Sequence, residues 1–220
     1  MARTRRIMPQ RPNIAAELEG APPTLAHRES WDGRHAGPGL RVDGTVADAE
    51  LIGSRFTGID FTSRTLTGLR ARDVVFDTCD LSGAVLDGAA FDRVVFTGCR
   101  LTGTMLTATR LRDVIIEDST ANLGNFRAAQ ADYLFIERTV LTESDFYTAR
   151  LRDSAILDCD LTGANVTDLH PERLSLHGST LDGLVGVTAL AGSRIDADQV
   201  IPLGAALVAG LGIRAGGRPR

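Results

Sequence analysis

The histidines and cysteines are the side chains best suited to catalysis or metal binding, and their spacing fits neither role. The histidines are scattered, and none lies beside a nucleophile in a recognisable order. The three cysteines cannot all pair, and the sequence carries no P-loop, paired-cysteine motif or glycine-rich strand-to-helix turn. We therefore expect inert cysteines, no catalytic residue, no metal site, no cofactor and no enzymatic activity. The residues concerned are His27, His35, His170 and His177, and Cys79, Cys99 and Cys159.

Composition places these residues in a mildly acidic chain of one domain. The sequence has 220 residues, with 28 acidic residues against 24 basic ones, all of which are arginine. A chain of this length can bury a continuous core. The N-terminal region has no apolar stretch of the kind that a secretory signal requires. Together with the cysteines, this predicts a reduced, cytoplasmic protein.

A repeat of five residues organises most of the chain and decides where its other side chains lie. From Val46 to Leu181, every fifth residue is large and apolar at 24 of 28 positions, and the residue two places earlier is mostly small. The four exceptions are Ala71, Ala121, Ala131 and Pro171. Neither an α-helix nor a flat strand keeps one face inward at a period of five. The pattern therefore predicts a coil that turns a corner at each pentapeptide, with a large and a small residue filling a narrow tube.

Individual pentapeptides make the chain similar to the pentapeptide-repeat proteins. Cys79-Asp80-Leu81, Ser144-Asp145-Phe146 and Cys159-Asp160-Leu161 follow that family's consensus closely. The resemblance implies an all-β fold, a right-handed quadrilateral parallel β-helix with four pentapeptides per coil. A weaker period of twenty supports this count, because strand-forming stretches recur at residues 73–76, 93–96, 113–116 and 133–136. Seven coils at ~4.8 Å per coil predict a tube about 34 Å long.

The pattern also divides the chain into three parts. Residues 1–45 contain Arg3, Arg5 and Arg6 followed by prolines and glycines, and are predicted to form a flexible or loosely ordered N-terminal segment. The alternative for Trp31 is that it covers the open end of the coil. Residues 46–183 form the β-helix. Residues 184–220 form a C-terminal cap with a short helix, whose apolar run is too short to span a membrane. This segment resembles the C-terminal end of the quinolone-resistance pentapeptide proteins, particularly the mycobacterial one. The resemblance implies a homodimer joined through Val200, Ile201, Leu203, Leu207 and Leu211.

The outer surface offers two hypotheses for a protein partner, and the first rests on acidic residues. Acidic side chains outnumber arginines on the faces centred on Ile116 and Leu101. By resemblance, such faces imply a DNA mimic that binds DNA gyrase in place of DNA, without binding nucleic acid itself. The negative charge is low for this role. About 34 Å of duplex DNA carries about 20 negative charges, whereas residues 46–183 have 13 arginines and 21 acidic residues, a net charge of −8. The candidate contact residues are Asp77, Glu117, Asp118, Glu137, Asp158, Asp60, Asp80 and Asp160.

The alternative is a general interaction scaffold with an unrelated partner. Val75, Val95, Ile115 and Phe135 each come one position before an inward residue, so they are predicted to form an exposed apolar stripe. A stacked row of exposed apolar residues is a candidate contact surface. A gyrase supercoiling assay with purified protein separates the two hypotheses.

Overall fold

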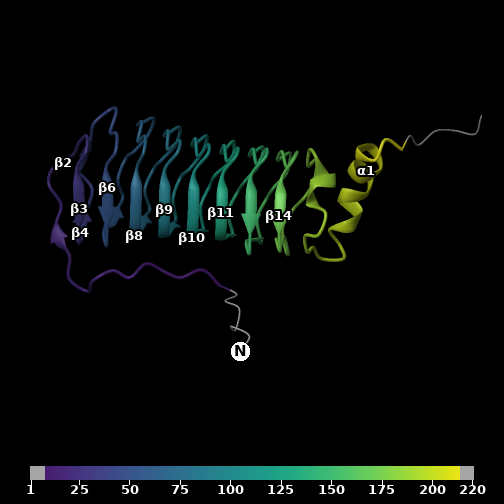
Figure 1. The fold of residues 1–220 in the computed structure, drawn as a ribbon, viewed down its shortest axis with the longest axis horizontal. Coiled ribbons are helices and arrows are strands. Elements are labelled where there is room, and N and C mark those ends of the chain that lie inside the picture. Colours follow the sequence, from purple (N-terminus) through teal and green to yellow (C-terminus); the bar gives the residue numbers. More distant parts are fainter. Residues whose placement is uncertain (1–7, 214–220) are drawn as a thin grey trace, which may run out of the picture.

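The chain forms a parallel β-solenoid of about seven turns, as the pentapeptide pattern predicts (Figure 1). The computed structural model describes residues 8–213. Neighbouring coils pair in parallel at an offset of twenty residues, so that Phe76, Phe96 and Ile116 stand in register. This offset confirms four pentapeptides per coil.

The strands follow the four-sided path. The N-terminal strands are β1 (Glu19–Gly20), β2 (Thr24–Leu25), β3 (Ser30–Asp32), β4 (Arg34–Ala36), β5 (Arg41–Val42), β6 (Glu50–Ile52) and β7 (Arg55–Thr57). The long central strands are β8 (Arg70–Asp77), β9 (Ala90–Thr97), β10 (Arg110–Glu117) and β11 (Gln130–Glu137). The last strands are β12 (Arg150–Arg152), β13 (Ala155–Leu157) and β14 (His170–Glu172), followed by the 3₁₀ helix η1 (Val187–Leu190) and the helix α1 (Val200–Gly210).

We number the four faces by their inward residues. Face 1 contains Leu51, Phe91 and Leu111; face 2 contains Phe56, Phe76 and Phe96; face 3 contains Phe61, Leu81 and Leu101; face 4 contains Leu66, Leu86 and Leu106. Each of the strands β8 to β11 covers faces 1 and 2 of one coil and runs through the corner between them.

Left-handed backbone at a fixed position makes each corner possible. The residue two places after each inward one has positive φ almost throughout the coil, for example 63° at Gly83 and 55° at Asp73. On face 3 this produces turns in which the Ala84 N–H donates to the Leu81 carbonyl at 2.9 Å. Non-glycine residues pay a steric cost of about 1 kcal/mol or more in this conformation, so packing of the tube must hold them there.

Aromatic side chains stack along the inside of face 2. The ring of Phe76 lies 5.1 Å from that of Phe56 and 4.9 Å from that of Phe96, nearly parallel to both. The ring of Phe61 meets Phe76 edge-on at 5.9 Å. All four side chains are buried. Such contacts add to the hydrophobic stabilisation of the tube.

The coil begins earlier than residue 46, which differs from the predicted flexible segment over residues 1–45. Trp31 pairs in register with Leu51, is 3% exposed, and stacks on Phe56. Leu25 and Val42 are also buried, and their strands pair with each other. Apolar side chains of residues 19–45 therefore cover the end of the tube. Residues 1–7, which include Arg3, Arg5 and Arg6, lie outside the described residues.

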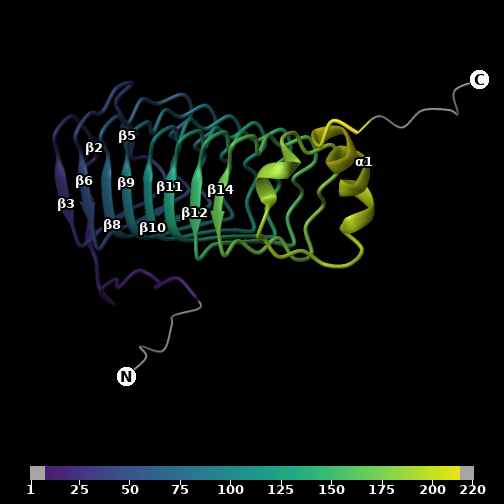
Figure 2. The same cartoon turned by 45° about the vertical axis from the view of Figure 1, so that its right-hand side comes forward.

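The opposite end is closed by α1, which lies across the last coil (Figure 2). Leu203 is buried against the coil. The buried Gln199 amide donates to the carbonyl oxygens of Leu176, at 2.8 Å, and Ser179. Leu176 and Ser179 lie near the end of the tube, so these hydrogen bonds tie the start of the helix to the last coils. The helix and its Gln199 therefore cover this end of the tube.

Candidate interaction surfaces

The cysteines have a packing role in the structure. Cys79, Cys99 and Cys159 are all buried free thiols. Burial raises the pKa of Cys159 to about 11, and contact with the Cys79 thiol together with burial raises the pKa of Cys99. Neither Cys99 nor Cys159 is a thiolate at neutral pH. Over residues 8–213, no group of three or more His, Cys, Asp or Glu side chains could hold a metal ion.

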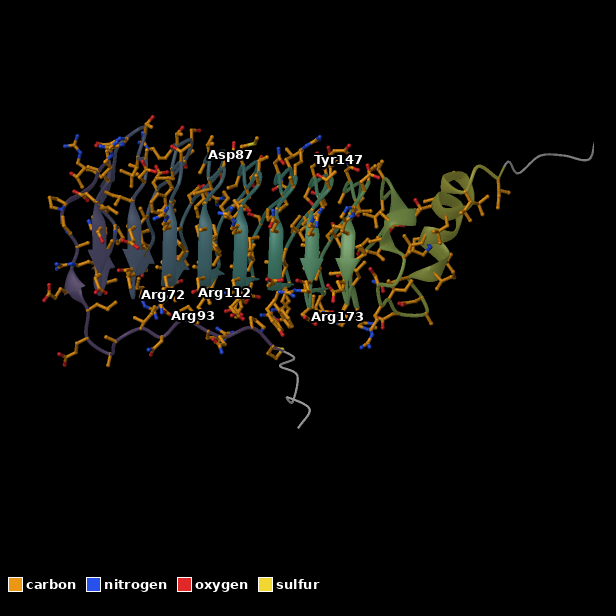
Figure 3. All side chains as sticks on the ribbon, viewed as in Figure 1. Arg72, Asp87, Arg93, Arg112, Tyr147 and Arg173 are labelled. Atoms are coloured by element: carbon orange, nitrogen blue, oxygen red, sulfur yellow. The ribbon has the colours of Figure 1, made fainter. Side chains whose placement is uncertain are left out.

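Arginine–aspartate ion pairs join successive coils on the outside of the tube. In each, the arginine comes twenty residues after its aspartate, so that the pair bridges neighbouring coils in register; Figure 3 shows several of these arginines along the lower edge of the strands. Donor–acceptor distances of 2.5–2.9 Å link Arg93–Asp73, Arg100–Asp80, Arg112–Asp92, Arg138–Asp118, Arg152–Asp132 and Arg173–Asp153. These pairs neutralise much of the acidic charge that the sequence places on the tube.

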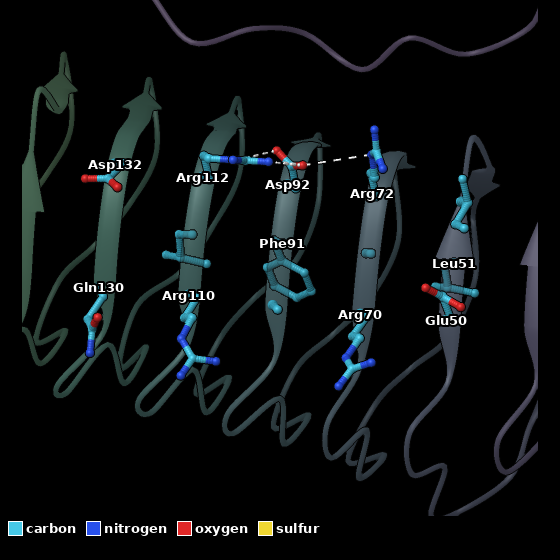
Figure 4. A pocket seen from close by; sticks show the side chains of 14 residues that line it. Glu50, Leu51, Arg70, Arg72, Phe91, Asp92, Arg110, Arg112, Gln130 and Asp132 are labelled. Carbon is cyan, nitrogen blue, oxygen red and sulfur yellow. Dashed lines mark hydrogen bonds and ion pairs between the residues drawn. The ribbon is translucent and has the colours of Figure 1, made fainter.

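Face 1 carries a shallow groove with separated charges. Figure 4 shows Arg112, Asp92 and Arg72 bridging across the strands near one edge, while Arg70 and Arg110 lie near the opposite edge. The groove has a volume of about 480 Å³. Arginine and aspartate alternate along one wall, at Arg72, Asp92, Arg112 and Asp132, as expected of a surface that solubilises the tube.

Half of the predicted acidic contact residues are held in ion pairs. Arg138 binds Asp118 at 2.7 Å and Glu137 at 2.6 Å, and the hydrogen bond from Arg138 lowers the pKa of Asp118. Glu117 binds Arg11 at 3.1 Å. Asp80 forms one of the ion pairs between coils, with Arg100. The structure therefore brings Glu117, Asp118 and Glu137 together, but with cations among them.

The other half remain without an ion-pair partner among residues 8–213. They are Asp60, Asp77, Asp158 and Asp160, on face 3 and along the corner between faces 2 and 3. Hydrogen bonds from the side chain and backbone of Thr62 lower the pKa of Asp60, which keeps this carboxylate ionised at neutral pH. Among the predicted contact residues, the carboxylates without an ion pair therefore form a discontinuous strip near one corner.

The predicted exposed apolar stripe is covered, which corrects that prediction. Val75, Val95 and Ile115 are 9%, 3% and 7% exposed, and Phe135 is half-buried beside them. Residues 8–18, which we call the N-terminal strap, lie on this row, with Ile14 packed against it. Figure 1 shows the strap running along the length of the tube, beside the lower ends of the strands. The inward–outward alternation was right, but an outward position is solvent-exposed only where nothing lies over it.

Two carboxylates anchor the strap by its backbone. The Asn13 N–H donates to Asp73 Oδ1 at 2.9 Å, and the Gln10 N–H donates to Asp113 Oδ1 at 2.9 Å. Asp73 and Asp113 occupy the same left-handed corner, two coils apart. Arg11 forms its ion pair with Glu117 on the same coil as Asp113.

Acid is expected to weaken the docking of the strap. Hydrogen bonds from Arg93 and from the Asn13 N–H lower the pKa of Asp73, with Arg72 adding to the effect of Arg93 and Asp92 lying beside the same arginines. A carboxylate whose pKa is lowered by docking favours the docked state above its ordinary pKa of about 3.9, and this contribution is lost as the pH falls through the lowered value. The NMR chemical shift of the Asn13 amide should therefore stay constant from pH 7 to 5 and change below about pH 4. A midpoint near pH 6, or an unchanged titration in Asp73→Asn, would contradict this assignment.

The C-terminal helix presents a mostly exposed apolar surface. Of the predicted dimer residues, Val200 is 53% exposed, Ile201 85%, Leu207 36% and Leu211 67%, whereas Leu203 is buried in its own coil end. Leu203 therefore holds the helix to the tube and is unavailable to a second copy. No helix within residues 8–213 is both long enough and apolar enough to cross a membrane.

Comparisons with known proteins found one family model and several solved structures. No curated protein matches the chain. A trypsin-treated variant of QnrB1, a plasmid-mediated fluoroquinolone resistance protein, is 18% identical, with 88% of this chain and 99% of that chain covered and a TM-score of 0.42. HetL, a pentapeptide repeat protein involved in heterocyst differentiation regulation from Nostoc sp. strain PCC 7120, is 15% identical, with 76% and 87% covered and a TM-score of 0.32. The family model for pentapeptide repeats matches residues 79–118 in eight copies. These repeats lie in the central coils of the solenoid, so this part of the chain is similar to the pentapeptide-repeat family.

Proposed function

We propose that this protein acts by binding another protein rather than by catalysis, and that its partner is a DNA-binding enzyme of the gyrase type, which it contacts in place of DNA. The observation that carries the proposal is the strip of unneutralised carboxylates along the corner between faces 2 and 3. Asp77 and Asp158 lie on that corner, and Asp60 and Asp160 flank it on face 3. A DNA-binding groove is basic, so it attracts an acidic strip of this kind.

The helix α1 supports a longer rod. Its exposed apolar residues Ile201, Leu207 and Leu211 lie at the very end of the tube. A second copy that covers them, related by a two-fold axis, would therefore extend the rod end to end. A homodimer would double both the length and the acidic charge offered to a groove. This offsets the low charge of a single tube relative to duplex DNA. A cytoplasmic location is part of the same proposal, because such a partner works on the chromosome.

A supercoiling assay with purified gyrase tests the proposal. We expect the wild-type protein to inhibit supercoiling at low micromolar concentration, and to do so less well as salt rises. The triple variant Asp60→Asn, Asp77→Asn, Asp158→Asn should inhibit at least tenfold less well. The matched control is Asp48→Asn, Asp87→Asn, Asp168→Asn, which removes the same charge from face 4 and should inhibit like the wild type. Equal loss in both variants, or no inhibition by the wild type, would refute the role of the strip.

A further inference from the structure

The strap and the row that it covers have the geometry of a peptide bound to a receptor. The strap contains no helix and joins no sheet between residues 8 and 18. It is held by two backbone N–H groups, one ion pair and one packed isoleucine. Most of its other residues are exposed, including Met8 at 59%. A segment with so few contacts is held weakly in comparison with the coils, which every neighbouring coil supports.

The spacing of its contacts explains why this segment fits. Gln10 and Asn13 are three residues apart and each follows a proline, Pro9 and Pro12, both half-buried. A polyproline II segment advances ~3.1 Å per residue, so three residues span about 9.3 Å. Two coils of the solenoid span about 9.6 Å. The N–H groups of an extended chain with this proline spacing therefore meet the carboxylates of Asp73 and Asp113 without strain.

Side chains add selectivity to this backbone match. Arg11 lies between the two anchored residues and reaches Glu117. Ile14 follows Asn13 and packs on the buried cluster of Val75, Val95 and Ile115. The strap thus reads as the pattern proline, any residue, arginine, proline, any residue, isoleucine over residues 9–14. Prolines pre-set the extended conformation and lower the entropy lost on binding, which is how proline-rich ligands are recognised elsewhere.

The surface on which the strap lies continues beyond Met8 as a groove. A groove of about 600 Å³ runs from Met8 over the next coils, with Phe135, Ala155 and Leu157 among its apolar residues and Arg173 and Arg194 at its far side. A longer ligand on this surface would cover Phe135, which the strap leaves half-buried.

We propose that face 2 is a binding site for extended, proline-containing segments of another protein with the pattern Pro-x-Arg-Pro-x-Ile, and that the strap is its intramolecular competitor. The partner's segment replaces the strap on Asp73, Asp113 and Glu117. A tethered strap is present at an effective concentration of about millimolar, so the site is closed to weak ligands and opens only to those that compete. This proposal does not rest on the proposed contact with gyrase.

The test uses the full chain with the strap released. The variant Arg11→Ser, Ile14→Asp removes the ion pair and the apolar contact of the strap, while the control Ala15→Asp changes a neighbouring exposed residue. The probe is a fluorescent synthetic peptide with the sequence of residues 8–18, followed by anisotropy. We expect the released variant to bind the peptide at least tenfold more tightly than the wild type and the control, because apparent affinity falls with the fraction of sites that are open.

A charge exchange shows whether binding follows the observed contacts. Adding Glu117→Arg to the released variant should weaken peptide binding at least tenfold, and a peptide with glutamate in place of its arginine should restore it. A peptide of otherwise different sequence that keeps the Pro-x-Arg-Pro-x-Ile pattern should bind within about fivefold of the original. Equal binding of all peptides, equal binding by wild-type and released chains, or no binding at all would overturn the proposal.

One further arm excludes a second copy as the occupant. The wild-type chain and the released variant are mixed, both carrying Leu207→Glu so that the helix surface contributes nothing, and their masses are measured by light scattering. We expect only monomers, since each wild-type strap is already held on its own face. A stable pair would assign the site to strap exchange between copies and overturn the assignment to another protein.

Discussion

Replacing Phe76 with alanine is expected to lower the free energy of unfolding by about 3–5 kcal/mol, the range for removing a buried aromatic ring and leaving a cavity in its place. The ring of Phe76 is stacked between those of Phe56 and Phe96 and is met edge-on by Phe61, so three aromatic contacts are lost with this one ring. A tube of paired coils cannot close around the cavity without breaking register, so little of this cost is relieved. Thermal denaturation followed by circular dichroism should show a melting temperature lower by roughly 10 °C.

The matched control for this variant lies on the outside of the same tube. Val140 is 39% exposed, and Val140→Ala removes apolar atoms without opening a cavity. Its effect should stay within about 0.5 kcal/mol. If the two variants melted together, the assignment of inward and outward positions would be wrong.

The second large effect is expected in the association of two chains. If the exposed surface of α1 joins two copies, Leu207→Glu would bring two like charges together across a symmetric interface, which costs several kcal/mol. We expect the dissociation constant to rise at least 100-fold, equivalent to about 2.7 kcal/mol. Size-exclusion chromatography with light scattering should give a dimer for the wild type and a monomer for the variant. Circular dichroism of the coil should be unchanged, because Leu203 still holds the helix.

Two further measurements make this prediction specific. Ile201→Glu, at the most exposed of the predicted positions, should have the same effect as Leu207→Glu. Val185→Glu places the same charge on an exposed valine of the coil itself and should leave the dimer intact. A monomeric wild-type chain would remove the basis for this interface.

The solenoid could be predicted from sequence because a single strict period encodes it. Every coil uses the same inward positions, so the phase read at Phe76 and Phe96 also places Phe126 and Phe146, which are indeed buried and stacked at 4.8 Å. The ion-pair ladder follows from the same offset, since an aspartate and an arginine twenty residues apart must meet on adjacent coils. The sequence contains this signal, although only the structure shows which pairs form.

Apart from Trp31 as a cover for the open end, the N-terminal coil could not be predicted because it breaks the period that identifies the others. Leu25 and Val42 pair at an offset of seventeen residues instead of twenty, and prolines and glycines separate them. Only Trp31 and Ala36 keep the phase of Leu51 and are buried. A terminal coil has a neighbour on one side alone, so fewer contacts constrain its length.

The strap could not be placed from sequence because its contacts are few and distant. Its hydrogen bonds to Asp73 and Asp113 span 60 and 103 residues, and two of its main anchors are backbone groups that any residue except proline supplies. Two signals were nevertheless present. A row of four apolar residues at outward positions indicates that another segment packs over it. Pro9 and Pro12, three residues apart, favour an extended conformation of the strap.

The twenty-residue register has a consequence for how such a chain can change in length during evolution. Duplication or deletion of a whole coil would alter the rod by ~4.8 Å and leave every later residue on its own face. Gain or loss of a single pentapeptide would instead rotate everything downstream by a quarter turn, carrying Asp158 and Asp160 away from Asp60 and Asp77. Between Asp73 and Asp113 even a whole-coil duplication is excluded while the strap is retained, because three residues of extended chain cannot reach across a third coil.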